Sequence, residues 1–130
     1  MRKADGYIAL IGVLIIGSVC VAIAVLLLVS GADTQRATLV TQQSAQARFL
    51  ADACAEEALQ DIHDNKAYAG SDSITAGQGS CVMTTTAPDS TSKIISASGT
   101  VDNVVRKVKI YVTIGSSSIS ITSWQEVGDL

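Results

Sequence analysis

Apolar residues are concentrated at one end of the chain. From Gly6 to Ala32 no side chain carries a charge. About 20 apolar residues are enough to cross a bilayer as a helix, so residues 7–29 are long enough to do so. Beyond this run the apolar positions become spaced, and this change predicts a separate folded region.

The pattern after the apolar run predicts that the helix continues. Residues 32–69 contain neither Pro nor Gly and are rich in Ala, Gln, Glu and Leu, which favour helix. Apolar positions recur at steps of three and four residues and mark one face. These positions are Ala47, Leu50, Ala51, Cys54, Ala58 and Ile62. We therefore predict an amphipathic helix over residues 32–67.

Alternation of apolar and polar residues predicts three or four antiparallel strands in the last third of the chain. The clearest case places Val108, Ile110 and Val112 on one face, with Lys107 and Lys109 opposite. The expected fold class is α+β, with a long N-terminal helix packed on an antiparallel β-meander at about residues 80–127.

Two segments are predicted to connect these elements. Residues 71–80 are rich in Ser and Gly and predict a loop. Asp102 and Asn103 predict a tight turn between two strands.

The N-terminal run has several interpretations. Arg2 and Lys3 precede it and Asp33 is the first charge after it, so an uncleaved anchor would keep its N-terminus in the cytoplasm. A secretory signal cleaved near Gly31 would release a soluble domain, although such signals have shorter apolar regions, of roughly 7–15 residues. A lipoprotein signal fits poorly, because Val19 precedes Cys20 and the apolar run continues past it.

A further interpretation rests on Gly6 and Tyr7. A short basic leader ends in Gly6, aromatic Tyr7 follows, and the apolar stretch begins at once. In this arrangement the chain resembles the type IV pilin and pseudopilin family. The resemblance implies that prepilin peptidase removes residues 1–6 by cutting between Gly6 and Tyr7, and that Tyr7 becomes N-methylated. Residues 7–31 would then be the transmembrane and filament-core helix, and residues 32–130 the extracellular head.

The chain departs from the family pattern at Ile11. The family places a Glu at this fifth mature position, where its carboxylate is thought to pair with the N-terminal amine of a neighbouring subunit. A buried charge pair is costly unless it is well satisfied, and its main use is often to fix register. Some minor tip pilins and pseudopilins also lack this Glu. The resemblance thus implies a minor or initiating subunit, with a major pilin of a divergent system as the alternative.

The resemblance also implies partners and a location. The partners are other pilin subunits, prepilin peptidase and an inner-membrane assembly platform, while an assembly ATPase drives extraction from the cytoplasmic side. The chain would lie in the cytoplasmic membrane as a single-pass protein, N-terminus inside, and then in a cell-surface filament. Adhesion, motility, DNA uptake and secretion all stay open as roles of that filament.

The chain has three cysteines. Cys20 lies in the apolar run, where a free Cys behaves as a small apolar residue. Cys54 lies on the apolar helix face and Cys81 begins a predicted strand, and outside the cytoplasm two such residues are expected to form a disulfide. Two free buried thiols are the alternative in a reducing compartment.

No motif indicates catalysis, a cofactor or a metal site. His63 lies near the predicted helix end, where we expect a solvated side chain favoured by the helix dipole. The adjacent carboxylates of Glu56 and Glu57 point to different helix faces and cannot act as a pair. The chain also lacks nucleophile-elbow and phosphate-loop patterns. We expect a structural protein, not an enzyme.

The charge distribution does not favour nucleic-acid binding. The net charge is −3. Arg106, Lys107 and Lys109 form the longest basic patch, which we interpret as a solvated sheet face.

Overall fold

The computed structural model describes residues 2–128, with the side chains of residues 6–128. Its elements are α1 (Arg2–Asp64), β1 (Gly70–Ala76), β2 (Gly79–Thr86), β3 (Ser92–Val101), β4 (Val104–Ile114) and β5 (Ile119–Val127). The chain forms two compact units, one ending at Leu39 and the other beginning at Val40. Each unit is described by itself.

The first unit consists of helix alone. From Gly6 to Leu39 every residue is exposed except Gly12, which is half-buried. The hydroxyl of Ser18 donates to the carbonyl oxygen of Ile15 at 2.8 Å, one turn back along the helix. This polar group is therefore satisfied within the helix, as an apolar environment requires.

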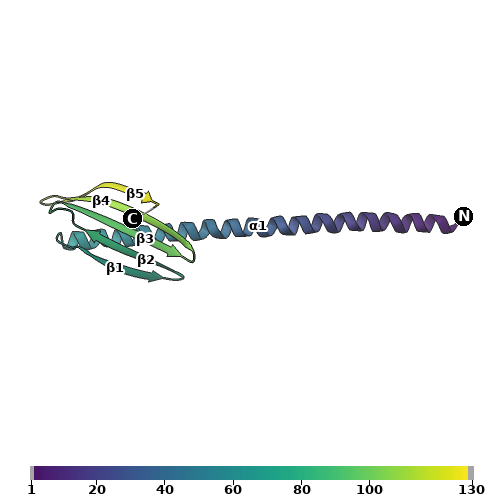
Figure 1. Ribbon diagram of the computed structural model, residues 1–130, viewed down its shortest axis with the longest axis horizontal. Helices are drawn as coiled ribbons and strands as arrows, with labels where there is room; N and C mark the ends of the chain where they lie inside the picture. The colour runs from purple at the N-terminus through teal and green to yellow at the C-terminus, as the bar shows by residue number, and fades with distance from the viewer. Residues whose placement is uncertain (1, 129–130) are drawn as a thin grey trace. The chain divides into compact units, whose positions relative to one another are not determined.

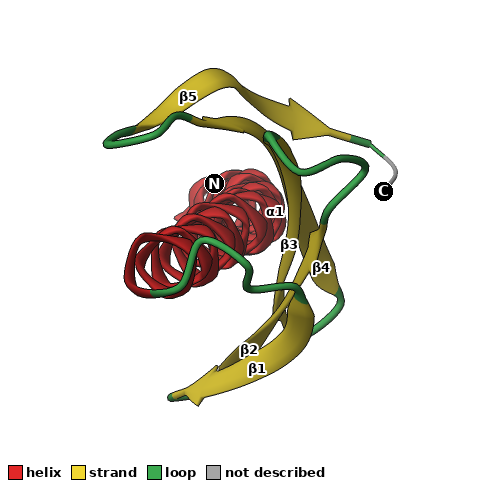
Figure 2. Ribbon diagram, turned by 90° about the vertical axis from the view of Figure 1, so that its left-hand side faces the viewer, coloured by secondary structure: helices red, strands yellow, loops and turns green. Residues whose placement is uncertain are grey.

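The second unit is a helix packed on an antiparallel sheet. The strands follow the order β1-β2-β3-β4-β5, so each pairs with its neighbour in sequence (Figure 1). The sheet curves around the part of α1 that begins at Val40, with β1 and β2 on one side and β5 on the other (Figure 2). The expected α+β fold is confirmed.

The sheet has five strands, so the expected count of three or four was wrong. The additional strand is β1, which occupies most of the segment predicted as a loop. Its sequence is GSDSITA, and only Ile74 and Ala76 are apolar, so it shows no clear alternation. Pairing with β2 forms this strand, helped by a turn at Gly77, whose φ of +60° suits glycine.

The outer edge of β1 is partly protected. The Oδ1 atom of Asp72 accepts a hydrogen bond from the backbone N–H of Ser73 at 2.7 Å. One backbone donor of this edge strand is thus occupied by the chain itself.

The helix ends three residues before the predicted boundary at residue 67. Asn65 causes this earlier end, because its side-chain Oδ1 accepts a hydrogen bond from the N–H of Ala67 at 3.0 Å. Its carbonyl oxygen accepts another from the N–H of Tyr68 at 2.8 Å. An asparagine that bonds to the following backbone favours a turn over continued helix.

Small residues bring the helix close to the sheet. The predicted apolar face is confirmed, because Ala47, Ala51, Cys54, Ala58 and Ile62 are fully buried. Leu50, also predicted, is half-buried against the core, and Ala55, which was not predicted, is fully buried. Gly99 of β3 lies directly beneath this face, because a Cβ atom added there would overlap the carbonyl oxygen of Ala47. The opposing buried side chains include Met83, Ile95 and Ile110.

The predicted turn at Asp102 and Asn103 joins β3 to β4, where Val101 pairs with Val104. Asp102 has a φ of +56°, a conformation that Asp adopts more readily than most residues.

A bulge in β5 changes which of its residues face the helix. Val112 pairs with Ile121 but Tyr111 pairs with Ser123, so Thr122 is an extra residue on this strand. Beyond the bulge the alternation is reversed, and Trp124 and Glu126 lie opposite the inward-facing Ile110 and Val108. Simple alternation from Ile119 onward does not predict this change.

Candidate functional site

The apolar part of α1 is the first candidate site. Within the described residues, α1 is the one helix long and apolar enough to cross a membrane, and its apolar stretch lies near the N-terminus with no part buried. Tyr7 is 65% exposed and Leu28 is 74% exposed. Contiguous apolar surface of this extent marks a membrane or protein interaction site. The stretch is thus compatible with burial in lipid or against other apolar helices.

The predicted cleavage point lies within α1. Gly6 and Tyr7 are both helical and exposed, and a Cβ atom added at Gly6 would meet nothing within 4 Å. A peptidase needs local unwinding of the helix to reach this bond. Glycine eases such unwinding because it destabilises a helix interior by about 1 kcal/mol relative to Ala. Cleavage there and N-methylation of Tyr7 stay predictions.

Ile11 occupies the position where the resemblance expects a carboxylate. Its side chain is 38% exposed. No Asp or Glu lies between Gly6 and Ala32, and the next carboxylate, that of Asp33, is exposed. If the chain is cut at Gly6, this stretch of helix offers no acidic partner for the new amine of another copy.

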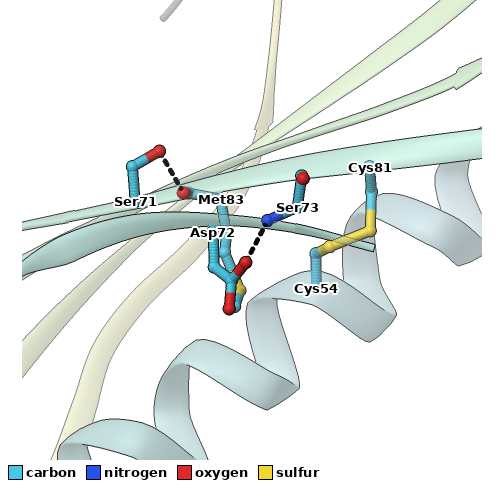
Figure 3. The surroundings of a disulfide bond; sticks show 6 residues. All are labelled: Cys54, Ser71, Asp72, Ser73, Cys81 and Met83. Carbon is cyan, nitrogen blue, oxygen red and sulfur yellow. Dashed lines mark hydrogen bonds between the residues drawn. A yellow bond between two sulfur atoms is a disulfide. The ribbon is translucent and has the colours of Figure 1, made fainter. Parts of the chain in front are cut away.

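A disulfide joins the helix to the sheet. Cys54 of α1 and Cys81 of β2 are bonded, with their Cα atoms 6.2 Å apart (Figure 3). Both residues are buried, and the core residues Met83 and Ala51 belong to the same cluster. The expected pairing is confirmed. Cys20 is free and exposed.

A polar cluster ties the end of β5 to the sheet and the helix. Arg106 Nη1 donates to Glu126 Oε1 at 2.8 Å, and Arg106 Nε donates to Ser44 Oγ of α1 at 2.9 Å. Arg48 Nη1 lies 3.7 Å from the other carboxylate oxygen of Glu126. The sequence did not predict this cluster, because the bulge decides that Glu126 faces the helix.

We expect Glu126→Gln to lower the free energy of unfolding by about 0.5–1 kcal/mol, because it removes the charge shared by Arg106 and Arg48. Urea unfolding of the full chain in detergent micelles, followed by the fluorescence of Trp124, measures the change. Glu56→Gln is the matched control, since Glu56 is exposed on α1. Equal effects of the two substitutions would contradict a role for the cluster.

Two titratable groups with shifted pKa values, those of Tyr68 and Asp89, lie in the segments that connect α1 to β1 and β2 to β3. Asp89 Oδ1 accepts hydrogen bonds from the backbone N–H and the hydroxyl of Thr91, and the backbone bond is the main cause of a lowered pKa for Asp89. Partial burial, followed by the charge of Asp61, raises the pKa of the Tyr68 phenol. The bonds between Asp89 and Thr91 hold the turn between β2 and β3.

The remaining candidates for chemistry lie apart. His63 is exposed, with its Nδ1 atom 3.4 Å from Asp64 Oδ1. Glu56 and Glu57 are exposed on α1. No group of three or more His, Cys, Asp or Glu side chains is placed to hold a metal ion in the part of the chain that the structure describes.

An apolar groove lies between α1 and the β1–β2 turn. Its volume is about 610 Å³, and Leu50, Val101 and Gly79 line it together with three glutamines, Gln42, Gln46 and Gln78. Phe49 stands at its edge and is 74% exposed. The head therefore carries apolar surface of its own, outside the membrane-length stretch.

Comparisons with protein-family models, curated proteins and solved structures find no match to this chain.

Proposed function

We propose that the chain is a structural subunit of a type IV pilus-like filament. The observation that supports this most directly is the boundary at Gly6 and Tyr7. There a short basic leader meets a helical stretch whose apolar side chains are exposed throughout. A cut at this point leaves the apolar helix attached to the folded head. The helix can then act first as an anchor and later as a packing surface.

Assembly is an exchange of one apolar environment for another. In the membrane, lipid covers the apolar stretch, and the backbone is satisfied by the helix itself. In a filament, the same side chains would pack against helices of other subunits. Lipid and helix surfaces are similarly apolar, so packing between small residues decides how closely the helices approach. Gly12 and Gly17 supply such positions.

The head is suited to withstand extraction from the membrane. Its helix is covalently bonded to the sheet through Cys54 and Cys81, and β5 is tied to the helix through Glu126. Both links hold the part of α1 that enters the head. The exposed ring of Phe49 adds an apolar contact for neighbouring heads.

Ile11 bears on the place of the subunit within the filament. Without a carboxylate at this position, the chain cannot neutralise the N-terminal amine of a neighbour in the usual way. This favours a subunit present in few copies or at one end. It also supports the second candidate function, a single-pass anchored extracellular domain that never leaves the bilayer.

N-terminal sequencing of the mature chain tests the proposal. In cells that carry a prepilin peptidase, we expect the purified protein to start at N-methylated Tyr7. Gly6→Leu should leave the chain uncut, because a bulky side chain blocks the residue before the cut. Gly12→Leu is the matched control, since a Cβ atom there also meets nothing within 4 Å, and it should be processed normally.

Other starting points favour the alternatives. An uncut wild-type chain indicates the anchored domain, and a start near residue 32 indicates a secreted one. Filaments sheared from the cells provide the second measurement. If the chain is cut at Gly6 but is absent from these filaments, the proposal of a filament subunit is wrong.

A further inference from the structure

The sheet covers one side of α1 in the head and leaves the opposite side open (Figure 2). Four residues on this open side recur at steps of three and four along the helix, so they share one face, and all of them are exposed. They are Gln42, Ala45, Gln46 and Phe49. None of the four is charged, and Phe49 is 74% exposed. The head thus has a neutral helix face that its own sheet does not cover.

The apolar groove of about 610 Å³ begins on this face. A Cβ atom added at Gly79 would overlap Leu50 Cδ1, so Leu50 of α1 reaches the start of β2 across the groove. Successive helix residues are about 100° apart around the axis, which places Phe49 and Leu50 on either side of Gln46. The ring of Phe49 and the part of the groove at Leu50 therefore lie on opposite sides of Gln46. A two-fold axis parallel to α1 and passing near Gln46 exchanges these two sides.

Anchoring in one membrane gives two copies of the chain the same orientation. The same apolar stretch holds each copy, so the same residues lie at the same height in both. Phe49 and Leu50 are adjacent in sequence, so the ring of one copy is level with the groove of the other. Equal height and two-fold exchange are the conditions for a self-complementary contact between identical surfaces.

We propose that the groove receives Phe49 of a second copy of this chain, in a parallel two-fold pair. Each Phe49 fills the groove of the other copy beside Leu50 and Val101, and its own groove is filled in return. The pair goes beyond the filament subunit proposed above. It rests only on membrane anchoring, which a filament precursor and a single-pass anchored domain share.

The groove has the polarity that contact between identical copies requires. None of the residues that line it is charged, whereas identical charges facing one another would repel. The amides of Gln42, Gln46 and Gln78 both donate and accept hydrogen bonds, so identical amides can pair with one another. The carboxylate of Asp102, in the β3–β4 turn, does not line the groove and accepts a hydrogen bond from Gln43 Nε2 at 3.0 Å.

Charged residues elsewhere on α1 limit how far the contact extends. Arg48 lies toward β5, with its Nη1 atom 3.7 Å from Glu126 Oε2. Glu56 and Glu57 are exposed, about two turns beyond Phe49. These carboxylates would repel their counterparts in a second copy, so the contact ends near Phe49 and the two helices diverge beyond it. Helices that cross at roughly 20° diverge in this way.

Shared anchoring makes a small contact sufficient. Two Phe49 side chains contribute roughly 300–500 Å² of buried surface, and the groove surfaces that they cover add a similar area. Specific complexes in free solution bury about 1,200 Å² or more in total. Two copies in one membrane have already lost part of their translational and rotational freedom, so less contact is needed to hold them together.

Cysteine crosslinking in membranes of cells that lack prepilin peptidase tests the proposal, because the chain stays uncut there and filaments do not assemble. Gln46→Cys, combined with Cys20→Ala, places one free thiol near the two-fold axis. We expect mild oxidation to give a covalent dimer on a non-reducing gel, since a disulfide needs Cα atoms within about 7 Å. Val105→Cys in the same background is the matched control, because Val105 is 47% exposed on β4. It should crosslink at least about tenfold more slowly.

A second pair of variants tests the role of Phe49. Phe49→Ser in the Gln46→Cys chain should slow crosslinking at least about tenfold, because it removes the apolar group that fills the groove. Val105→Ser is its control, since it removes an exposed apolar side chain outside the groove, and it should leave crosslinking unchanged. Phe49 is exposed in the single chain, so its replacement does not disturb the core.

Three results would each overturn the proposal: no dimer with Gln46→Cys, equal crosslinking with Val105→Cys, or a dimer that survives Phe49→Ser. The last result would mean that the apolar stretch alone holds the copies together. None of the three bears on the filament proposal, which the start of the mature chain and the sheared filaments decide.

Discussion

Gly99→Ala is expected to lower the free energy of unfolding of the head by about 3 kcal/mol. The added methyl group would overlap the carbonyl oxygen of Ala47 and lie 2.7 Å from the backbone nitrogen of Ala51. Both are helix backbone atoms, so no side-chain rotation can relieve the clash. The helix must instead move away from β3 and loosen its contacts with the sheet.

Urea unfolding of the full chain in micelles measures this loss, because Trp124 is the chain's one tryptophan and lies in β5. Gly128→Ala is the matched control, since its Cβ atom would meet nothing within 4 Å. We expect this control to change stability by no more than about 0.5 kcal/mol. If Gly99→Ala is equally mild, the helix does not pack on β3 as closely as described.

Replacing both disulfide cysteines, Cys54→Ala with Cys81→Ala, is expected to cost about 3–4 kcal/mol. The bond closes a loop between residues 27 apart in sequence, and without it the unfolded chain gains conformational freedom. Both positions are buried, so alanine also leaves unfilled space where the sulfur atoms were. The same unfolding assay, with and without a reducing agent, measures the loss.

Cys20→Ala serves as the control, because Cys20 is free and lies in the other unit. It should leave the unfolding of the head unchanged. Reduction of the wild-type chain should reproduce most of the effect of the double variant. If reduction has no effect on the unfolding midpoint, the disulfide does not stabilise the head.

The helix and its buried face could be predicted because local sequence determines them. Ala, Gln and Glu favour helix wherever they occur, and the spacing of Ala47, Ala51 and Ala58 defines one face independently of the partner sheet. The disulfide followed from the same reasoning, because Cys54 lies on that face and Cys81 faces inward from β2.

Features that depend on pairing could not be predicted. The strand β1 has few apolar residues, and it forms because β2 offers an edge to it. The contact of Glu126 with Arg106 depends on the extra residue Thr122, which no local pattern marks. A shallow cavity of about 360 Å³ beside Tyr111 likewise requires residues from the Pro88 loop and from three strands, β3, β4 and β5, to meet. The proposed cleavage point at Gly6 was inferred from consecutive residues alone, so it does not depend on strand pairing, and it stays a prediction.

The internal hydrogen bond between Asp72 and Ser73 has a consequence for crowding. An array that holds many of these domains side by side brings the edge strands of neighbouring copies close together. Unpaired edge strands tend to pair with one another and form intermolecular β-sheets. An edge strand with one backbone N–H group already hydrogen-bonded, beside a negatively charged carboxylate, is a poor template for such pairing. Neighbouring copies then remain separate domains at packing densities at which unprotected edge strands would pair.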